Sequence, residues 1–501
     1  MSDPADLTAI EARQLIGRRK LSPVELADAC IARTEAINPA INAVVAADFE
    51  RLREEALTAE AAVQKGAPLG PVHGLPFGVK YMIDVTGLPT TFGSELFKDN
   101  IADRDDAIVA AMRYAGAVVL GKTNNPEFSA GGNTVNTVYG PTGNPHDPTK
   151  SAAGSSGGSA AALATGMVPL CTGSDTGGSL RNPAAFCGVV GFRPSPGVVP
   201  GDKRGTALLP LPTSGPMART VADTALMLSI MARPDPLDPF TAVIGGKTLW
   251  NPEDFVTLPR RDLASLKVAF TEDFGFAMTE RVIRQAFRER IETLGPLFSL
   301  TEENTPDSTG ADRIFAVLRA VTMLASHHDN TVKYPGRFGP NIMANVEEGL
   351  GYTALDVADA MTRQGLYYRN WQRFFDDYDY ILSPAVTISP RDWNELYPAE
   401  IDGVATESYY QWLALAYAST LAGHPSITIP MGRDDFGMPF GLQIVGRKND
   451  DLGVLAVAAE IEAIFAGDER FGAPKPDLAA LKTAKPILEG LAAKAGELTA
   501  S

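Results

Sequence analysis

The first part of the chain alternates between helix-like and strand-like patterns of hydrophobic and polar positions. Ser22, Pro23 and Glu25 open the segment 22–37, and Ser at the N-cap, Pro at N1 and Glu at N3 are typical of a helix start. Further segments of predicted structure are 48–64 (helix), 74–88 (strand and loop), 105–115 (helix), 117–120 (strand) and 157–174 (helix, then strand). Such alternation favours an α/β architecture whose strands are buried on both faces.

The pattern changes beyond about residue 232. Amphipathic stretches rich in charged and aromatic residues predict long helices at 279–295, 311–328 and 354–377. Short apolar runs typical of strands return at 380–382, 426–429 and 441–445. We therefore expect a largely helical section over 232–420 that covers the sheet, and a peripheral helix in the Ala/Lys-rich tail 474–501.

Composition and charge exclude several classes of protein. Hydrophobic residues make up 45% of the 501 and charged residues 21%, which excludes a disordered or collagen-like chain. Lys and Arg number 44 against 60 Asp and Glu, so the formal net charge is −16. Because nucleic-acid binders usually carry a basic footprint, we expect no nucleic-acid partner, and anionic membrane surfaces are disfavoured for the same reason.

The cysteine content indicates a reducing compartment. Cys30, Cys171 and Cys187 cannot all pair within one chain, and so small a number fits reduced thiols. The first residues lack the basic and then apolar regions of a signal peptide. No run of about 20 apolar residues predicts a membrane span. We therefore expect a cytoplasmic protein with no membrane partner.

The sequence gives little support for a phosphate-binding loop, a metal site or a histidine- or cysteine-based active site. Residues 116–123 match the phosphate-loop pattern GxxxxGK[ST], but a helix-like segment precedes them and the four middle residues are strand formers. They predict a buried strand that leaves into a turn. The five histidines lack the spacing of metal ligands, so we expect no metal site. His146 stays open as the base of a serine triad, and a thiol nucleophile at Cys171 or Cys187 is disfavoured because buried cysteines usually act as small hydrophobes.

Glycine and serine are concentrated in residues 151–193. Ser155 and Ser156 precede two glycines and a helix-like run, and Ser179 follows Gly177 and Gly178. Paired glycines before a serine let backbone N–H groups turn inward, which builds an oxyanion hole without side chains. Taken alone, each segment also fits an ordinary glycine-rich turn at a sheet edge.

A serine hydroxyl needs a base to become a nucleophile, and Lys80 is the strongest candidate. It follows the apolar run 74–79 and precedes Tyr81. A lysine serves as a base only where burial lowers its pKa. The alternative for Lys80 is a surface lysine whose alkyl stem covers apolar neighbours.

These residues together resemble the amidase signature family. The resemblance is strong over about 71–223, thin over 232–420, and returns in 421–470. Besides Lys80, the matching segments are 154–158 (GSSGG), 173–181 (GSDTGGSLR), 182–191 (NPAAFCGVVG), 215–223 (GPMARTVAD), 424–430 (HPSITIP) and 441–446 (GLQIVG). The resemblance implies one α/β domain, 1–501, with a central mixed twisted sheet covered by helices on both faces. Within it, 71–223 would be the signature core and 421–470 a return to the core sheet.

The resemblance also implies a Ser–cis-Ser–Lys triad. Ser179 would be the nucleophile, Ser155 the bridging serine after a cis peptide bond, and Lys80 the general base. The implied oxyanion hole consists of the N–H groups of Thr176, Gly177, Gly178 and Ser179. The implied supporting residues are Ser156, Asp175 and Arg181, with Asp84 as a partner of Lys80 because Tyr81 stands where family members often carry an acidic residue. No metal or organic cofactor is needed for this chemistry.

The resemblance leaves three functions open. A stand-alone amidase would hydrolyse a small-molecule amide, with carbamates, esters and cyclic or oligomeric amides as alternatives. The amidase subunit of a glutamine-dependent amidotransferase would use the same triad, but the Tyr-Gly pair usual after Gly191 is replaced by Phe192 and Arg193. A non-catalytic binding protein is disfavoured because all three triad positions are present. A homodimer is implied by resemblance alone.

The substrate pocket is expected between the section 310–420 and the loop near 125–140. Phe128, Gly131 and Tyr139 are the expected substrate-binding residues. Further aromatic candidates, for each of which core packing is the stronger alternative, are Trp371, Trp393, Tyr409 and Trp412. An aromatic lining predicts aryl or medium-chain amides as better substrates than acetamide.

Overall fold

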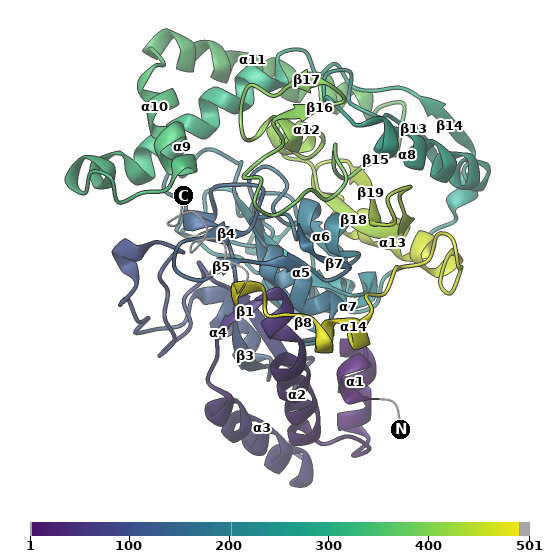
Figure 1. Cartoon of the computed structure of the whole chain (residues 1–501). Coiled ribbons are helices and arrows are strands. Elements are labelled where there is room, and N and C mark those ends of the chain that lie inside the picture. Colours follow the sequence, from purple (N-terminus) through teal and green to yellow (C-terminus); the bar gives the residue numbers. More distant parts are fainter. Residues whose placement is uncertain (1–2, 202, 490–501) are drawn as a thin grey trace.

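A mixed sheet of 11 strands forms the centre of the protein (Figure 1). The computed structural model describes residues 3–201 and 203–489. In spatial order the strands are β1 (Val44–Ala46), β3 (Val118–Thr123), β2 (Pro76–Lys80), β8 (Leu170–Asp175), β10 (Thr213–Ala218), β9 (Val190–Arg193), β18 (Ser426–Arg433), β19 (Pro439–Gly446), β15 (Tyr380–Pro384), β13 (Lys267–Phe270) and β14 (Leu300–Glu303).

Parallel and antiparallel pairs share this sheet. Strand β2 pairs in parallel with β3 and β8, and β13 pairs in parallel with β14 and β15. The other pairs of the sheet are antiparallel. Short strands outside it are β4 (Val135–Asn136), β5 (Gly140–Pro141), β6 (Gly143–Asn144), β7 (Asp147–Ser151), β11 (Val243–Ile244), β12 (Lys247–Thr248), β16 (Glu400–Ile401) and β17 (Val404–Ala405). The expected α/β fold with a central mixed sheet is confirmed.

Helices cover both faces of the sheet. They are α1 (Ala9–Gly17), α2 (Pro23–Ile41), α3 (Phe49–Gln64), α4 (Ala107–Tyr114), α5 (Gly157–Ala164), α6 (Arg181–Cys187), α7 (Val221–Met231), α8 (Arg281–Leu294), α9 (Ala311–Lys333), α10 (Pro340–Leu350), α11 (Ala354–Phe374), α12 (Ala414–Ala422), α13 (Asp451–Ile464) and α14 (Leu478–Thr483). On β19, a Cβ at Gly441 would meet Ala185 of α6 and a Cβ at Gly446 would meet Val454 of α13. Odd and even strand positions point to opposite faces, so α6 and α13 cover different faces.

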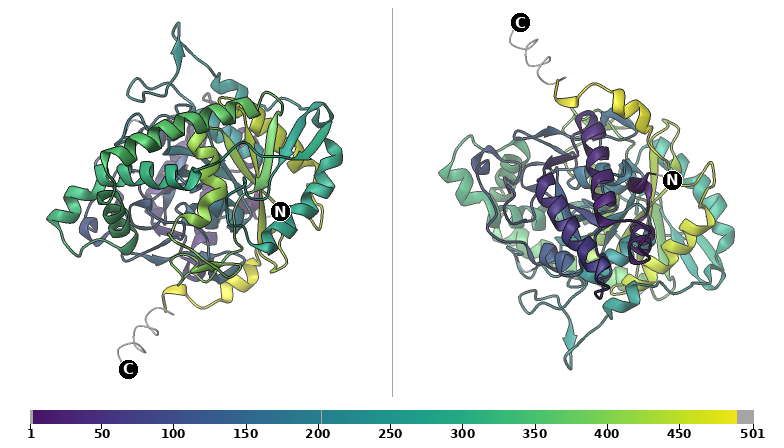
Figure 2. Two further views of the ribbon diagram at one scale, coloured as in Figure 1. Left: turned by 90° about the horizontal axis from the view of Figure 1, so that it is seen from above. Right: turned by 90° about the horizontal axis from the view of Figure 1, so that it is seen from below.

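Capping residues start the first helices as the sequence predicts. Ser22 and Glu25 form a complete capping box at the N-terminus of α2, with Pro23 in the first turn. The Asp48 side chain accepts from the Arg51 N–H at the start of α3. Figure 2 shows α1, α2 and α3 side by side on the underside of the molecule.

The section 232–420 contributes more than helices. It contains α8 to α12, but β13, β14 and β15 also belong to it and extend the central sheet. Helices α9, α10 and α11 form the upper layer in Figure 1. The hairpin β11–β12 projects from the body (Figure 2). In the tail, α14 lies in the range expected to be helical, and residues 490–501 lie outside the described part.

The short apolar runs all prove to be buried strands. The run at 118–123 is β3, whose six residues are buried, so the phosphate-loop pattern falls on a strand and not on a loop. The three cysteines are buried and unpaired. Within the described ranges, the molecule has no helix that is both long and apolar enough to span a bilayer.

Candidate active site

Strand β2 carries Lys80 into the interior. All five residues of β2 are buried, and Lys80 is fully buried at the C-terminal end of the strand. Its backbone N–H donates to Thr172 Oγ1 at 2.8 Å. Its Nζ donates to Ser155 Oγ at 2.7 Å and to Ser174 Oγ at 2.8 Å. The amine is thereby held against hydroxyl groups from two other segments of the chain.

Burial changes the protonation of Lys80. It lowers the pKa of Lys80 from 10.5 to about 7, while the Asp175 carboxylate acts in the opposite direction. An ammonium group loses hydration when it enters a protein interior, which disfavours the charged form. A large fraction of Lys80 is therefore neutral slightly above pH 7, and a neutral amine can accept a proton.

Ser155 lies in the turn that enters α5. The peptide bond between Gly154 and Ser155 is cis. The N–H of Ser156 donates to the carbonyl oxygen of Ser179 at 3.3 Å, which joins the two serine-bearing segments. Ser155 and Ser179 line one cavity, so both hydroxyl-bearing residues border the same space.

Ser174 is a member of the site that the sequence analysis missed. Its Oγ accepts from Lys80 Nζ, and its backbone N–H and carbonyl oxygen each lie 3.4 Å from Ser156 Oγ. Ser156 occupies the N-cap of α5, but its side chain does not cap the helix. Its hydroxyl contacts the backbone of Ser174 instead. The sequence held a signal for Ser174, because residues two apart in a strand point to the same face. Thr172 and Ser174 therefore share one face of β8, and both bind Lys80.

The loop after β8 presents backbone N–H groups beside Ser179. Gly178 has a φ of +108°, and its N–H donates to Asp175 Oδ1 at 2.8 Å. This amide is therefore engaged with Asp175, and its expected part in the oxyanion hole stays a prediction. Within the part of the chain that the structure describes, no hydrogen bond involves the N–H groups of Thr176, Gly177 and Ser179. Unpaired backbone N–H groups of this kind are the donors that an oxyanion hole requires.

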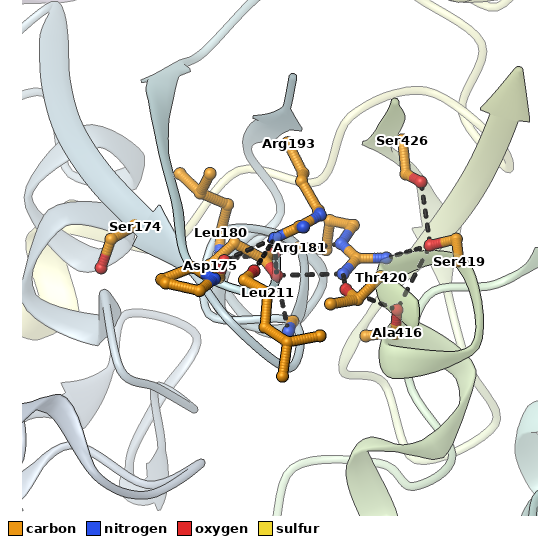
Figure 3. A network of polar contacts seen from close by, with 12 residues as sticks. Ser174, Asp175, Leu180, Arg181, Arg193, Leu211, Ala416, Ser419, Thr420 and Ser426 are labelled. Atoms are coloured by element: carbon orange, nitrogen blue, oxygen red, sulfur yellow. Dashed lines mark hydrogen bonds and ion pairs between the residues drawn. The ribbon is translucent and has the colours of Figure 1, made fainter. Parts of the chain in front are cut away.

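The carboxylate of Asp175 fixes this loop (Figure 3). It accepts from Arg181 Nε and Nη2, both at 3.0 Å, and Arg193 Nη1 lies 3.4 Å away. Burial alone would raise the pKa of Asp175, but the two guanidinium groups hold it well below its usual range. Arg181 also donates to three side chains of the C-terminal part, Ser419, Gln443 and Thr420. The loop is thus tied to α12 and β19 through buried polar contacts.

A cavity of about 280 Å³ opens beside Ser179. Phe128 and Gly131, two of the expected substrate-binding residues, line it. The apolar lining also includes Met82, Ile83, Phe315, Met323 and Leu413, and the ring of Tyr410 lies beside them. The charged lining residues have partners of their own, which are Asp106 for Lys203, Asp238 for Arg204 and Glu348 for Arg319. The cavity thus favours an uncharged, apolar ligand.

Comparisons with known proteins identify the family. The model of the family described as Amidase matches residues 25–455. The chain belongs to the amidase family. An acylamidase of Rhodococcus erythropolis is 36% identical over 461 residues, which cover 91% of this chain and 95% of that protein. A glutamyl-tRNA(Gln) amidotransferase subunit of Chloroflexus aurantiacus is 31% identical, over 91% of this chain and 96% of its own length.

Solved structures agree with that assignment. A bacterial aryl acylamidase of the amidase signature family superimposes with a TM-score of 0.86 at 26% identity, over 96% of this chain and 99% of that chain. A 6-aminohexanoate cyclic dimer hydrolase gives 0.79 at 27% identity, over 95% and 99%. The amidase is therefore a hydrolase of amide carbon–nitrogen bonds.

Two expected residues of this amidase lie elsewhere. Tyr139 is not among the residues that line the described cavity. Its hydroxyl is hydrogen-bonded to that of Tyr81, and the two ring centroids lie 4.9 Å apart. Asp84 was expected beside Lys80, but its carboxylate accepts from Lys203 Nζ at 2.9 Å. The carboxylate that acts electrostatically on Lys80 is Asp175.

The remaining candidates are placed away from the reacting atoms or at the edge of the cavity. Tyr409 lines the cavity, whereas Trp371 and Trp412 are buried in the apolar core. The carbonyl oxygen of Trp393 accepts from Asn133 Nδ2 at 2.9 Å. His146 Nε2 lies 3.2 Å from the carbonyl oxygen of Cys187, and burial lowers the pKa of His146 to about 4. Burial also raises the pKa values of Cys171 and Cys187, so both thiols stay protonated.

Proposed function

We propose that this amidase works through an acyl-enzyme on Ser179, with Ser155 as proton relay and Lys80 as general base. The observation that carries the proposal is the 2.7 Å contact between Lys80 Nζ and Ser155 Oγ in a fully buried site. A lysine with a pKa of about 7 meets the requirement for a base that operates near neutrality.

The proposed reaction begins when neutral Lys80 takes the proton of Ser155 as Ser155 takes that of Ser179. Ser179 Oγ attacks the amide carbon, and the carbonyl oxygen becomes an oxyanion. The free N–H groups of Thr176, Gly177 and Ser179 stabilise this charge, and one such donor is worth about 3–4 kcal/mol in another hydrolase.

The second half of the reaction releases the two products. The proton held by Lys80 returns through Ser155 to the nitrogen of the substrate. The carbon–nitrogen bond breaks, and the amine leaves with that proton. Water then attacks the acyl ester of Ser179 and gives up a proton through Ser155 to Lys80. The proton returns along the same path to Ser179 Oγ as its bond to the acyl carbon breaks, so the carboxylic acid departs and the free enzyme is restored.

The substrates we propose are uncharged aryl or medium-chain amides. The apolar lining of the cavity and the pairing of its charged residues support this choice. The names of the acylamidase and aryl acylamidase relatives point the same way. A panel of anilides and alkyl amides tests it: hexanoyl anilide should have a higher kcat/KM than acetamide, and the reverse order would contradict it.

Membership of a glutamine-dependent amidotransferase complex is the second candidate, which the likeness to the glutamyl-tRNA(Gln) amidotransferase protein favours. Arg193, which replaces part of the Tyr-Gly pair usual in such proteins, is engaged here with Asp175. Glutaminase activity together with a stable partner in a pull-down would support this candidate. A homodimer, also proposed from family resemblance, is tested by light scattering on the purified chain.

Trapping the intermediate tests the mechanism. The amidase is mixed with a hexanoyl anilide, quenched in acid and digested, and the peptide that contains Ser179 is weighed by mass spectrometry. A hexanoyl mass increment on that peptide, absent from Ser179→Ala, is the expected result. An increment on another residue would contradict the assignment of the nucleophile.

A further inference from the structure

Helix α9 places one aromatic ring directly against the loop after β8, which comprises residues 176–179. A Cβ added at Gly177 would lie 2.9 Å from Phe315 Cζ, so the tip of the Phe315 ring touches the loop two residues from Ser179. Phe315 lines the cavity, yet only 1% of its surface is exposed. Its ring therefore ends the cavity as a wall and does not project into open space.

Two tyrosines hold this ring in place. Phe315 stacks on Tyr417 with the centroids 4.2 Å apart and 9° between the planes. Its edge meets Tyr410 at 5.8 Å and 65°. The Tyr417 hydroxyl donates to Asp312, which lies one turn before Phe315 on α9. Because both neighbours are themselves buried, the ring has little freedom to turn aside.

A second cavity lies behind this wall. It has a volume of about 760 Å³ and is lined by Asp312, Ala316 and Tyr417, among others. Tyr409 and Tyr410 line both cavities. The partition between the two cavities therefore includes the stacked rings of Phe315 and Tyr417, and Phe315 is the ring on the side of the catalytic serines.

The proton path indicates which part of the substrate meets this wall. The leaving nitrogen must receive its proton from Ser155, so the amine lies on the side of Ser155 and Lys80. Phe315 has its contacts with Gly177, Tyr410 and Tyr417. In our proposal, the acyl chain, which extends from the same carbon in another direction, lies on the side of Phe315.

We propose that Phe315 sets the maximum length of the acyl group that the amidase accepts. This inference rests on the proposed acyl-enzyme mechanism. For acyl chains that end before the ring, each additional buried methylene should raise kcat/KM about fourfold. Longer chains collide with a ring that Tyr417 and Tyr410 keep from moving. Removal of the ring extends the cavity toward Tyr417.

The test compares two substrate series in wild type, Phe315→Ala and Phe315→Leu. One series holds aniline constant and lengthens the acyl group from acetyl to dodecanoyl, and the other holds acetyl constant and enlarges the aryl amine. In Phe315→Ala the longest productive acyl chain should grow by two or more methylenes. For chains beyond the wild-type limit, kcat/KM relative to acetanilide should rise at least tenfold. Phe315→Leu should give a smaller shift, and the ranking of amines should not change.

Phe128→Ala is the matched control, because it removes a phenylalanine from another wall of the same cavity. An equal shift of the acyl limit in Phe128→Ala would overturn the special role of Phe315. An unchanged limit in folded Phe315→Ala, or a shift in the amine series alone, would overturn it as well. If thermal unfolding shows that Phe315→Ala is not folded, the proposal is tested by Phe315→Leu, in which an unchanged limit on acyl length would overturn it. A wild-type protein that hydrolyses no amide of either series would refute the proposed function instead.

Discussion

The Nζ of Lys80 lies 2.7 Å from Ser155 Oγ at the end of a side chain that has no contact with solvent. The same nitrogen also donates to Ser174. Ser155 lies at the entry to α5 and Ser174 on β8, both far from Lys80 in sequence. The sheet and the entry to α5 thus together give Lys80 the surroundings of a base. This arrangement, and the loop that carries Ser179, determine how activity and stability should respond to pH and to substitution.

The acid limb of the activity profile should report Lys80. The neutral amine is the active form and burial lowers its pKa to about 7, so kcat/KM should fall tenfold per pH unit below that value. Measurements of kcat/KM between pH 5 and 9 check this. A limb centred near pH 4, where His146 titrates, would point to a different base.

Lys80→Met should abolish turnover and stabilise the fold. The native state holds a lysine with a depressed pKa and the unfolded state does not, so wild-type stability rises with pH between about 7 and 10.5. Met removes the cost of burying an amine but also loses the two hydrogen bonds of Lys80 Nζ. We expect the free energy of unfolding to rise by about 3 kcal/mol near pH 7, and this difference should shrink toward pH 10. Thermal unfolding at several pH values measures the difference, and a gain that increases with pH would be inconsistent with a neutral native Lys80.

Ser174→Ala should shift the pH profile. Ser174 Oγ accepts from Lys80 Nζ at 2.8 Å, and a charged donor gains more from that bond than a neutral one. Its loss should move the acid limb down by up to about one pH unit, with a fall in kcat because Lys80 is less well positioned. Ser174→Thr, which keeps the hydroxyl, should restore the profile. A reduced kcat with an unmoved profile in Ser174→Ala would mean that Ser174 has a packing role only.

Asp175→Asn should destabilise the fold by about 3–5 kcal/mol. Arg181 and Arg193 are fully buried, and loss of the carboxylate leaves both charges without their counter-ion. Asp84→Asn is the control, since it removes a carboxylate whose partner Lys203 is largely exposed, and should change stability by less than about 1 kcal/mol. Chemical unfolding of the two variants compares them directly, and equal stabilities would refute a structural role for the Asp175 network.

Local patterns predicted local structure, and long-range packing decided the rest. Ser22 and Glu25 cap α2 because capping depends on neighbours within one turn. The apolar run before Lys80 left a buried base and a surface lysine as alternatives, and the packing of β2 inside the sheet decided for the buried one. The hydrogen bond from the Gly178 N–H back to Asp175 depends on the backbone conformation of the loop, which no local sequence pattern indicated. Phe315 reaches the loop only through the packing of α9, more than 130 residues further along the chain, and no local pattern could reveal it.

The nucleophile and its base form the central claim, and covalent labelling with a serine-directed fluorophosphonate tests both. Purified wild type, Ser179→Ala, Lys80→Ala and His146→Ala are treated at pH 8, and the labelled peptide is mapped by mass spectrometry. The account predicts label on Ser179 in wild type and in His146→Ala, and none at that position in Ser179→Ala or Lys80→Ala. Label on a different residue, or a loss of label in His146→Ala alone, would contradict it.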